Sequence, residues 1–298
     1  MSCVKNLIAC FPNEAYFNYN GDKHIFPTYS GLGDILQSIY FIYLASKTFD
    51  FNLFLDFSSS SINDLINYNS FKFKDPAPKN VIGVNSFELF DAIESCSDKN
   101  LFIFCSGSSN HFPDFSDLEF KKILKNIFLS DSKLEELDDK TAFHFRLGDN
   151  YITDDDFLNY YYLSKHDHPY PPSNWFNSLP ETLKFKKILD WIALNNFNPD
   201  FICSDSKNLK KYLKNNLNFR YNDFDINHTG LKTSKVDDFK NAIQDFQCLC
   251  SYGSIYTISS FPYGRRRSAF SAYARFLSKN QSGKDYYFDF GNVSIDLL

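Results

Sequence analysis

The sequence predicts an α/β fold in which parallel strands alternate with helices. Short apolar runs, bounded by polar or glycine-rich segments, alternate with longer stretches of helical periodicity along most of the chain. Such alternation indicates parallel strand pairing with right-handed crossovers. At 298 residues the chain is longer than one typical domain, so we expect two such units.

The first unit, residues 1–138, is expected to begin with a strand at 4–9 and a turn-rich segment at 12–27. Gly31-Leu32-Gly33-Asp34 then leads into a helix with a broad apolar face. Farther along, apolar runs predict strands at 51–57, 80–84 and 101–105, and periodicity predicts helices at 61–68, 87–95 and 117–137.

The second unit, residues 139–298, is expected to begin with a strand at 141–145. An irregular polar and aromatic stretch follows at 150–180, and loops of this length are usually functional or mobile. We then expect helices at 181–195, 207–217, 236–251 and 268–278, with strands at 201–203 and 255–258 and a tail after the last helix.

Composition excludes several classes of protein. A net charge of −5 and a pI near 5.7 argue against a general nucleic-acid binder. Seven cysteines without a C-x-x-C pair indicate free thiols in a reducing compartment rather than disulfides or a zinc site. Since no signal peptide and no long apolar stretch is evident, we expect a cytoplasmic protein without an integral membrane segment.

The strand at 141–145 ends in a turn that carries His144, Arg146 and Asp149. Ligands of open α/β folds bind at the carboxyl ends of strands, and the arginine fork suits phosphate. The turn therefore predicts an anionic ligand, with a nucleotide as the first choice. A surface turn that uses Gly148 for its backbone and Asp149 as a cap accounts for the same residues.

Gly31 and Gly33 lie directly before a helix, where glycine lets the backbone approach a ligand and helix amides favour an anion. The full G-x-G-x-x-G pattern is absent, because Gln37 and Ser38 follow. A plain glycine turn with Asp34 as the helix cap is the alternative.

Two further segments join a strand to a helix. Ser204 and Asp205 either cap the next helix or contact a base or ribose. Residues 259–271 concentrate hydroxyl and guanidinium groups, which predicts a diphosphate cradle unless the segment is a solvated basic loop. The residues of this cradle are Arg265, Arg266, Arg267, Ser268, Phe270 and Ser271.

In this order the motifs resemble those of the GT-B fucosyltransferases, chiefly the α-1,2 branch and its α-1,6 and protein O-fucosyl relatives. Residues 144–149 are similar to their His-x-Arg-x-Gly-Asp motif, and Ser268-Ala269-Phe270-Ser271 to their closing Ser-x-Phe-Ser. The glycine loop and Ser204-Asp205 match as well, although the glycine loop is equally similar to that of heptosyltransferases. Ala269 and the extra loop at 262–267 depart from the pattern.

The resemblance implies a GT-B fold, with two Rossmann-like domains whose parallel sheets face each other across a cleft. It implies an inverting transfer of fucose from GDP-fucose to a glycan hydroxyl, without a metal ion or other cofactor. Arg146 would hold the diphosphate, and Asp34, Asp149 and His24 are the candidates for the general base. A heptosyl- or rhamnosyl-type transferase and a non-catalytic nucleotide- or glycan-binding module are the alternatives.

Overall fold

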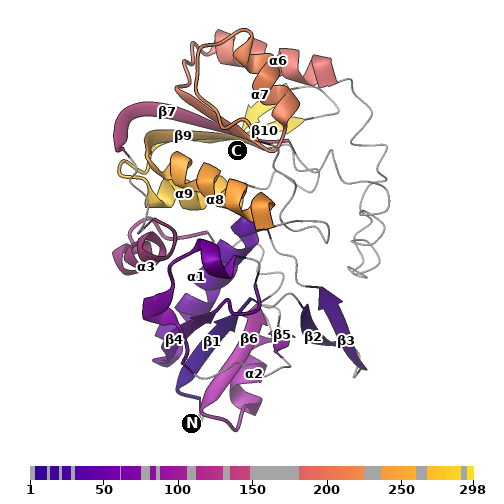
Figure 1. Cartoon of the computed structure of the whole chain (residues 1–298), viewed down its shortest axis with the longest axis vertical. Helices are drawn as coiled ribbons and strands as arrows, with labels where there is room; N and C mark the ends of the chain where they lie inside the picture. The colour runs from indigo at the N-terminus through magenta and orange to yellow at the C-terminus, as the bar shows by residue number, and fades with distance from the viewer. Residues whose placement is uncertain are drawn as a thin grey trace.

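The chain forms two sheets, each made mainly of parallel strands and flanked by helices (Figure 1). This confirms the predicted α/β class. The computed structural model describes residues 4–11, 14–19, 22–27, 31–60, 62–74, 81–84, 88–105, 112–129, 135–147, 181–224, 236–259, 267–289 and 294–298.

The first sheet has the strand order β3-β2-β5-β6-β1-β4. Its strands are β1 (Asn6–Cys10), β2 (Glu14–Tyr19), β3 (Asp22–Pro27), β4 (Asn52–Asp56), β5 (Ile82–Val84) and β6 (Asn100–Cys105). The pair β2 and β3 is antiparallel, whereas the other pairs are parallel. The sequence predicted turns where β2 and β3 lie. An antiparallel pair at a sheet edge needs no continuous apolar run, so its strands cannot be recognised by one.

The helices of the first half are α1 (Leu32–Phe49), α2 (Leu89–Ser95) and α3 (Leu118–Phe128). The prediction of one helix over 117–137 was wrong, since α3 ends at Phe128, where the apolar spacing of its buried residues also ends. The helix expected at 61–68 is reduced to a 3-10 turn at Asn63–Leu65.

The second sheet has the order β11-β10-β9-β7-β8. Its strands are β7 (Leu137–Arg146), β8 (Phe201–Ser204), β9 (Tyr252–Ser259), β10 (Asp285–Asp289) and β11 (Ser294–Leu297). Helices α6 (Glu181–Leu194) and α7 (Lys207–Lys214) cover one face, and α8 (Val236–Cys250) and α9 (Ala269–Leu277) the other (Figure 1). Strands β10 and β11 lie in the segment that was expected to be only a tail.

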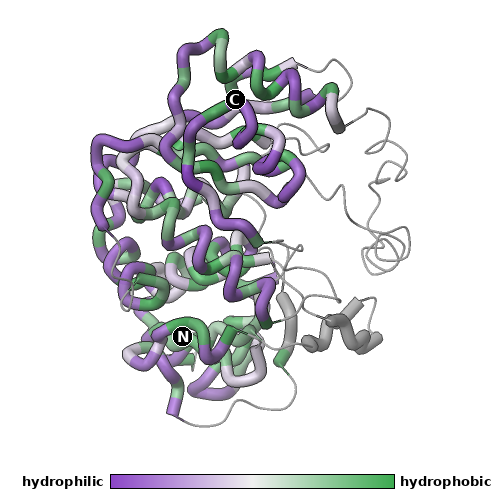
Figure 2. Tube along the Cα trace, turned by 45° about the horizontal axis from the view of Figure 1, so that its top comes forward, coloured by the Kyte–Doolittle hydropathy of each residue, from purple (hydrophilic) through white to green (hydrophobic). Residues whose placement is uncertain are grey.

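Alternate residues of β7 face different cores, as the two-residue period of a strand requires. Phe143 and Phe145 belong to the core under α6 and α7, whereas Ala142 belongs to the core on the α8 and α9 side. Hydropathy also alternates along the helices (Figure 2), so each presents an apolar side to a sheet or to another helix.

Between the sheets, α1 and α3 pack against α8 and α9 (Figure 1). Aromatic rings meet in this layer, with centroid distances of 6.5 Å for Tyr40 and Tyr273, 5.9 Å for Phe120 and Phe276, and 5.8 Å for Phe128 and Phe246. One hydrophobic core therefore extends from the first sheet into the second. The division at residue 138, which falls inside β7, stays a prediction.

Within the described residues, no helix combines the length and the apolar character needed to cross a membrane. The five cysteines whose state the structure describes are free thiols, as the sequence predicted: Cys10, Cys96, Cys203, Cys248 and Cys250.

Candidate functional site

The candidate site lies at the carboxyl edge of the second sheet, where β7 runs between β8 and β9. Strand register places Phe145 beside Ser204 and Arg146 beside Ser259. Asp205 follows β8 directly, so it reaches the same edge. The three loops predicted to bind a ligand in the second half therefore start from neighbouring strand ends, as open α/β sheets require.

Arg146 is held by Asp205. Its Nη1 lies 2.5 Å from Asp205 Oδ2, and the Leu147 amide donates to Asp205 Oδ1 at 3.1 Å. Both side chains are largely shielded, with 19% and 15% of their surface exposed. Asp205 thus orients the guanidinium at the edge of the sheet.

This arrangement corrects the expectation that Ser204 and Asp205 cap the next helix. Ser206 is the N-cap of α7, because its hydroxyl accepts from the Leu209 amide at 3.1 Å. The Ser204 hydroxyl instead accepts from the Ser206 amide at 3.0 Å. Ser206, the last residue of the predicted capping segment 204–206, is thus the cap, and Asp205 pairs with Arg146.

His144 lies two register rows inside the Arg146–Ser259 row, beside Thr257 of β9. It is 4% exposed, and its ring packs at 5.1 Å against the ring of Phe270. Burial, and secondarily the Arg146 charge, lowers the pKa of His144 to about 3. His144 is therefore neutral near pH 7, and it contributes a neutral ring rather than a cation to the site.

Two buried polar atoms near this edge have no hydrogen-bond partner among the described residues: His144 Nδ1 and Ser259 Oγ. A buried polar atom without a hydrogen bond lowers stability, so such atoms are rare in native proteins and often mark a place where water or a ligand binds. Both side chains lie on the face of the sheet that α9 covers. Thr257 pairs with His144 and lies two residues before Ser259, so the three side chains share one face. The Thr257 hydroxyl accepts from Arg275 of α9, which identifies that face.

Among the described residues, no side chain caps the N-terminus of α9. Ser268 is its N-cap but makes no side-chain bond to the first amides. Ser271, fully buried, directs its hydroxyl to the Ser268 carbonyl at 3.3 Å rather than to an amide. Free amides at a helix N-terminus carry partial positive charge and favour an anion. Ser268, Phe270 and Ser271, which were predicted to form a phosphate cradle, thus lie at the N-cap and in the first turn of α9.

The glycine loop meets this helix start. A Cβ atom on Gly33 would lie 3.1 Å from the Phe270 amide nitrogen and 3.2 Å from Ala269 Cβ. The missing side chain therefore lets α1 and α9 touch at their first turns, and a residue from each half lines the same region. Gly31 is the N-cap of α1 and donates its amide to Asp34 Oδ2 at 3.2 Å. Asp34 is therefore not the N-cap residue, but its side chain caps the Gly31 amide from the third position of the helix, as in a capping box.

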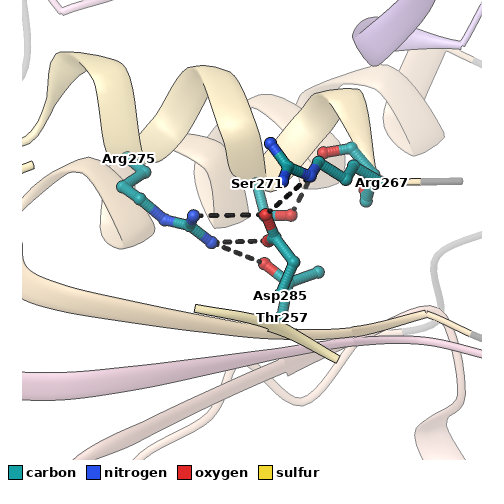
Figure 3. Close-up of polar contacts among 6 residues, drawn as sticks. Thr257, Arg267, Ser271, Arg275 and Asp285 are labelled. Atoms are coloured by element: carbon teal, nitrogen blue, oxygen red, sulfur yellow. Dashed lines mark hydrogen bonds and ion pairs between the residues drawn. The ribbon is translucent and has the colours of Figure 1, made fainter. Parts of the chain in front are cut away.

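Arg267 is exposed, with 55% of its side-chain surface accessible, and its Nε lies 3.5 Å from Asp285 Oδ2 (Figure 3). Asp285 also binds Arg275, so a buried carboxylate joins two arginines under α9. Asp285 was not predicted as a site residue, although an acidic residue directly before an aromatic run can be recognised in the sequence. Arg265, Arg266, Asp149 and the side chain of His24 lie outside the described residues.

The described residues contain no group of three or more His, Cys, Asp or Glu side chains that could hold a metal ion. Among the described acidic side chains, the Asp223 carboxylate lies 3.7 Å from the Lys207 ammonium. The polar donors at the edge are an arginine, helix amides and hydroxyls, which suit an anion rather than a cation.

No family model and no curated protein matches the chain. Among solved structures, it is similar to the fucosyltransferase NodZ from Bradyrhizobium, at 15% identity and a TM-score of 0.45 over 99% of each chain. It is also similar to NodZ α-1,6-fucosyltransferase soaked with GDP-fucose, at 12% identity and a TM-score of 0.45 over 99% of both chains. A mutant of Arabidopsis thaliana FUT1 in complex with GDP gives 10% identity and a TM-score of 0.48, over 95% of this chain and 70% of that one.

Proposed function

We propose that the chain is a glycosyltransferase of the GT-B type that binds a nucleoside diphosphate sugar at the carboxyl edge of the second sheet. One observation carries the proposal: Arg146 and the start of α9 lie on the same face of that edge, with Ser259 beside Arg146. Within the described part of the chain, no side chain caps α9 and the Ser259 hydroxyl has no hydrogen-bond partner. A guanidinium and free helix amides together match the charge and the acceptor oxygens of a diphosphate.

The proposed reaction is an inverting transfer. A hydroxyl of the acceptor attacks the anomeric carbon, the bond to the β-phosphate oxygen breaks, and the nucleoside diphosphate leaves with the negative charge. Arg146 stabilises that charge, assisted by the α9 amides and by Arg265, Arg266 and Arg267. Asp205 keeps the Arg146 fork in place before the substrate arrives, so little reorganisation is needed during the reaction.

The acceptor hydroxyl must lose its proton to a base within hydrogen-bond reach. Asp34 is the candidate whose side chain the structure describes, exposed in the first turn of α1 beside the start of α9. We propose Asp34 for this role, with Asp149 and His24 as the other candidates. Asp34→Asn should lower kcat more than it raises the KM for the donor, because the base acts during transfer; an unchanged kcat would remove Asp34 from the mechanism.

The motif resemblance supports GDP-fucose as the donor and a glycan hydroxyl as the acceptor, and we propose that the transfer needs no metal ion and takes place in the cytoplasm. The melting temperature should rise with GDP more than with UDP, ADP or dTDP. GDP-fucose should then be turned over with a suitable acceptor, with equal rates in EDTA and in magnesium. A response confined to ADP or dTDP would favour a heptosyl- or rhamnosyl-type enzyme, and binding without turnover would favour a non-catalytic module.

Replacement of Arg146 tests the site directly. Arg146→Ala should lower kcat/KM by at least about 100-fold, comparable to loss of one oxyanion donor at about 2.7 kcal/mol. Arg146→Lys separates charge from geometry, since lysine keeps the charge but loses the planar fork. Arg220→Ala is the matched control, because Arg220 is an exposed arginine that pairs with Phe201 at the opposite end of β8. Near-full activity of Arg146→Ala would reject the assignment.

A further inference from the structure

Asp285 begins β10 and lies beneath α9, with 7% of its surface exposed. Its carboxylate accepts from Arg275 Nη2 at 2.6 Å and from Arg275 Nη1 at 3.3 Å. Arg275 Nη2 also donates to the Thr257 hydroxyl at 3.3 Å. Arg275 comes from the last turn of α9, so Asp285 fixes the C-terminal end of this helix to the sheet.

The same carboxylate reaches the other end of the helix. Arg267 precedes the Ser268 N-cap, and its Nε lies 3.5 Å from Asp285 Oδ2. Figure 3 shows Asp285 between the two arginines, below α9 and above the strands. Two guanidinium groups therefore share one buried carboxylate, which determines where α9 lies along the sheet and how its first turn meets the edge.

The Arg267 guanidinium keeps a second edge for other partners. Its contact with Asp285 uses Nε, and within the described residues no hydrogen bond occupies its terminal nitrogens. A guanidinium offers five N–H donors in a rigid fork, so one edge can bind a carboxylate while the other binds a phosphate. Arg267 and Arg275 together carry two positive charges and Asp285 carries one negative charge, so one positive charge remains near the first amides of α9.

We infer that Asp285 is a positioning residue: through Arg275 and Arg267 it holds the N-terminus of α9 and the Arg267 fork in the geometry that binds the donor diphosphate. The inference rests on the proposed function for the identity of the ligand. That the helix start binds an anion does not depend on the proposed function. Asp285 itself does not touch the ligand in this scheme, because its carboxylate would repel a phosphate and lies under the helix.

The test uses a double variant, Asp285→Asn with Arg275→Met. Removal of Asp285 alone would leave the Arg275 charge buried and unpaired, which is strongly destabilising, whereas replacing both groups avoids that charge. The dissociation constants for GDP and for inorganic pyrophosphate should each rise about tenfold, by analogy with the loss of a side chain that orients a metal ligand. The KM for the donor should rise more than kcat falls, and amide exchange should quicken in residues 268–277 but not in α8.

Asp138→Asn is the matched control. It removes an ion pair with Lys279, which follows α9, but both side chains are exposed and neither reaches the helix start. Its affinities should equal those of the wild-type chain. A folded double variant that binds both anions with wild-type affinity would overturn the inference.

Other outcomes separate the two proposals. A wild-type chain that binds pyrophosphate but not GDP would reject the nucleotide-sugar site, and the pyrophosphate affinities of the variants would still decide the role of Asp285. A wild-type chain that binds neither would reject both. If the double variant does not fold, Arg267→Gln decides, because it leaves the Arg275 pair intact; unchanged pyrophosphate binding by that variant would overturn the inference.

Discussion

His144 is placed where a positive charge would be poorly solvated and close to Arg146. The pKa of its imidazole is lowered from 6.5 to about 3, chiefly by burial and then by Arg146. The unfolded chain binds a proton at His144 near pH 6.5, whereas the folded chain does not. The free energy of unfolding therefore has its full value, as far as His144 is concerned, above that pH. It falls as the pH drops from about 6.5 toward 3.

The pH dependence of unfolding tests this state of His144. Between pH 6 and 5 the free energy of unfolding should fall with a His144 contribution of about 1.4 kcal/mol per pH unit. His144→Phe keeps a ring against Phe270 and should show a smaller fall over the same interval, measured by urea denaturation at each pH. Equal pH slopes in the two chains would mean that His144 is protonated in the folded state.

Residue types at the site were predictable from the sequence, but several roles were not. Arg146, Ser268 and Ser271 stand where strand and helix patterns place them. Asp205 was recognised as a polar residue after a strand, yet its pairing with Arg146 depends on the register of β7 and β8. Asp285 was missed for the same reason, since its partners come from a helix that precedes it in the chain.

At the scale of elements, the contact between α1 and α9 decides how the halves share the site. Gly33 has helical neighbours on both sides, so alanine would by propensity alone favour α1 by up to about 1 kcal/mol. The contact opposes this, because a Cβ would lie 3.1 Å from a backbone nitrogen of α9. Overpacking of this kind typically costs about 1–3 kcal/mol.

Gly33→Ala should therefore lower the melting temperature and weaken the stabilisation given by GDP, since the first turns of both helices must separate by a few tenths of an ångström. Leu44→Ala, on the more exposed side of the same helix, serves as the control for a substitution in α1. Thermal unfolding with and without GDP measures both effects. A rise in melting temperature for Gly33→Ala would show that α9 yields freely at this contact.

Elements with a strong hydrophobic period were predictable, and those without it were not. Helices α1, α8 and α9 and strands β7 and β9 follow from their apolar spacing. The pairs β2–β3 and β10–β11 are antiparallel and lie at sheet edges, where a partner on one side suffices and the local pattern is weak. The overlong helix at 117–137 arose because polar helix formers continue after the buried residues of α3 have ended.

At the scale of the whole molecule, one hydrophobic core spans both halves, and a second core lies between the second sheet and helices α6 and α7. Hydrogen bonds also cross between the halves, from Lys121 to the Ser278 carbonyl at 2.8 Å and from Gln247 to the Phe128 carbonyl at 2.7 Å. Rings of Phe246, Tyr273 and Phe276 would lose their partners if the first half were removed. The halves are therefore expected to depend on each other for stability.

Expression of residues 139–298 alone tests this dependence. The fragment should expose the α8 and α9 faces, bind a hydrophobic dye and unfold with a broad, low-temperature transition. The intact chain should unfold in a single cooperative transition followed by circular dichroism. A fragment with a sharp transition and no dye binding would show that the second half is an independent domain, with the division predicted at residue 138.

The position of β7 between β8 and β9 has a consequence for the time course of folding. Arg146 ends β7, yet its neighbour Ser259 is made only after α6, α7 and α8 have been synthesised. Contacts between distant parts of a chain form slowly, because a long loop must be closed first. The edge that we assign to the donor is thus among the last features to be assembled, and a chain released before residue 259 would contain Arg146 without the strand that completes its surroundings.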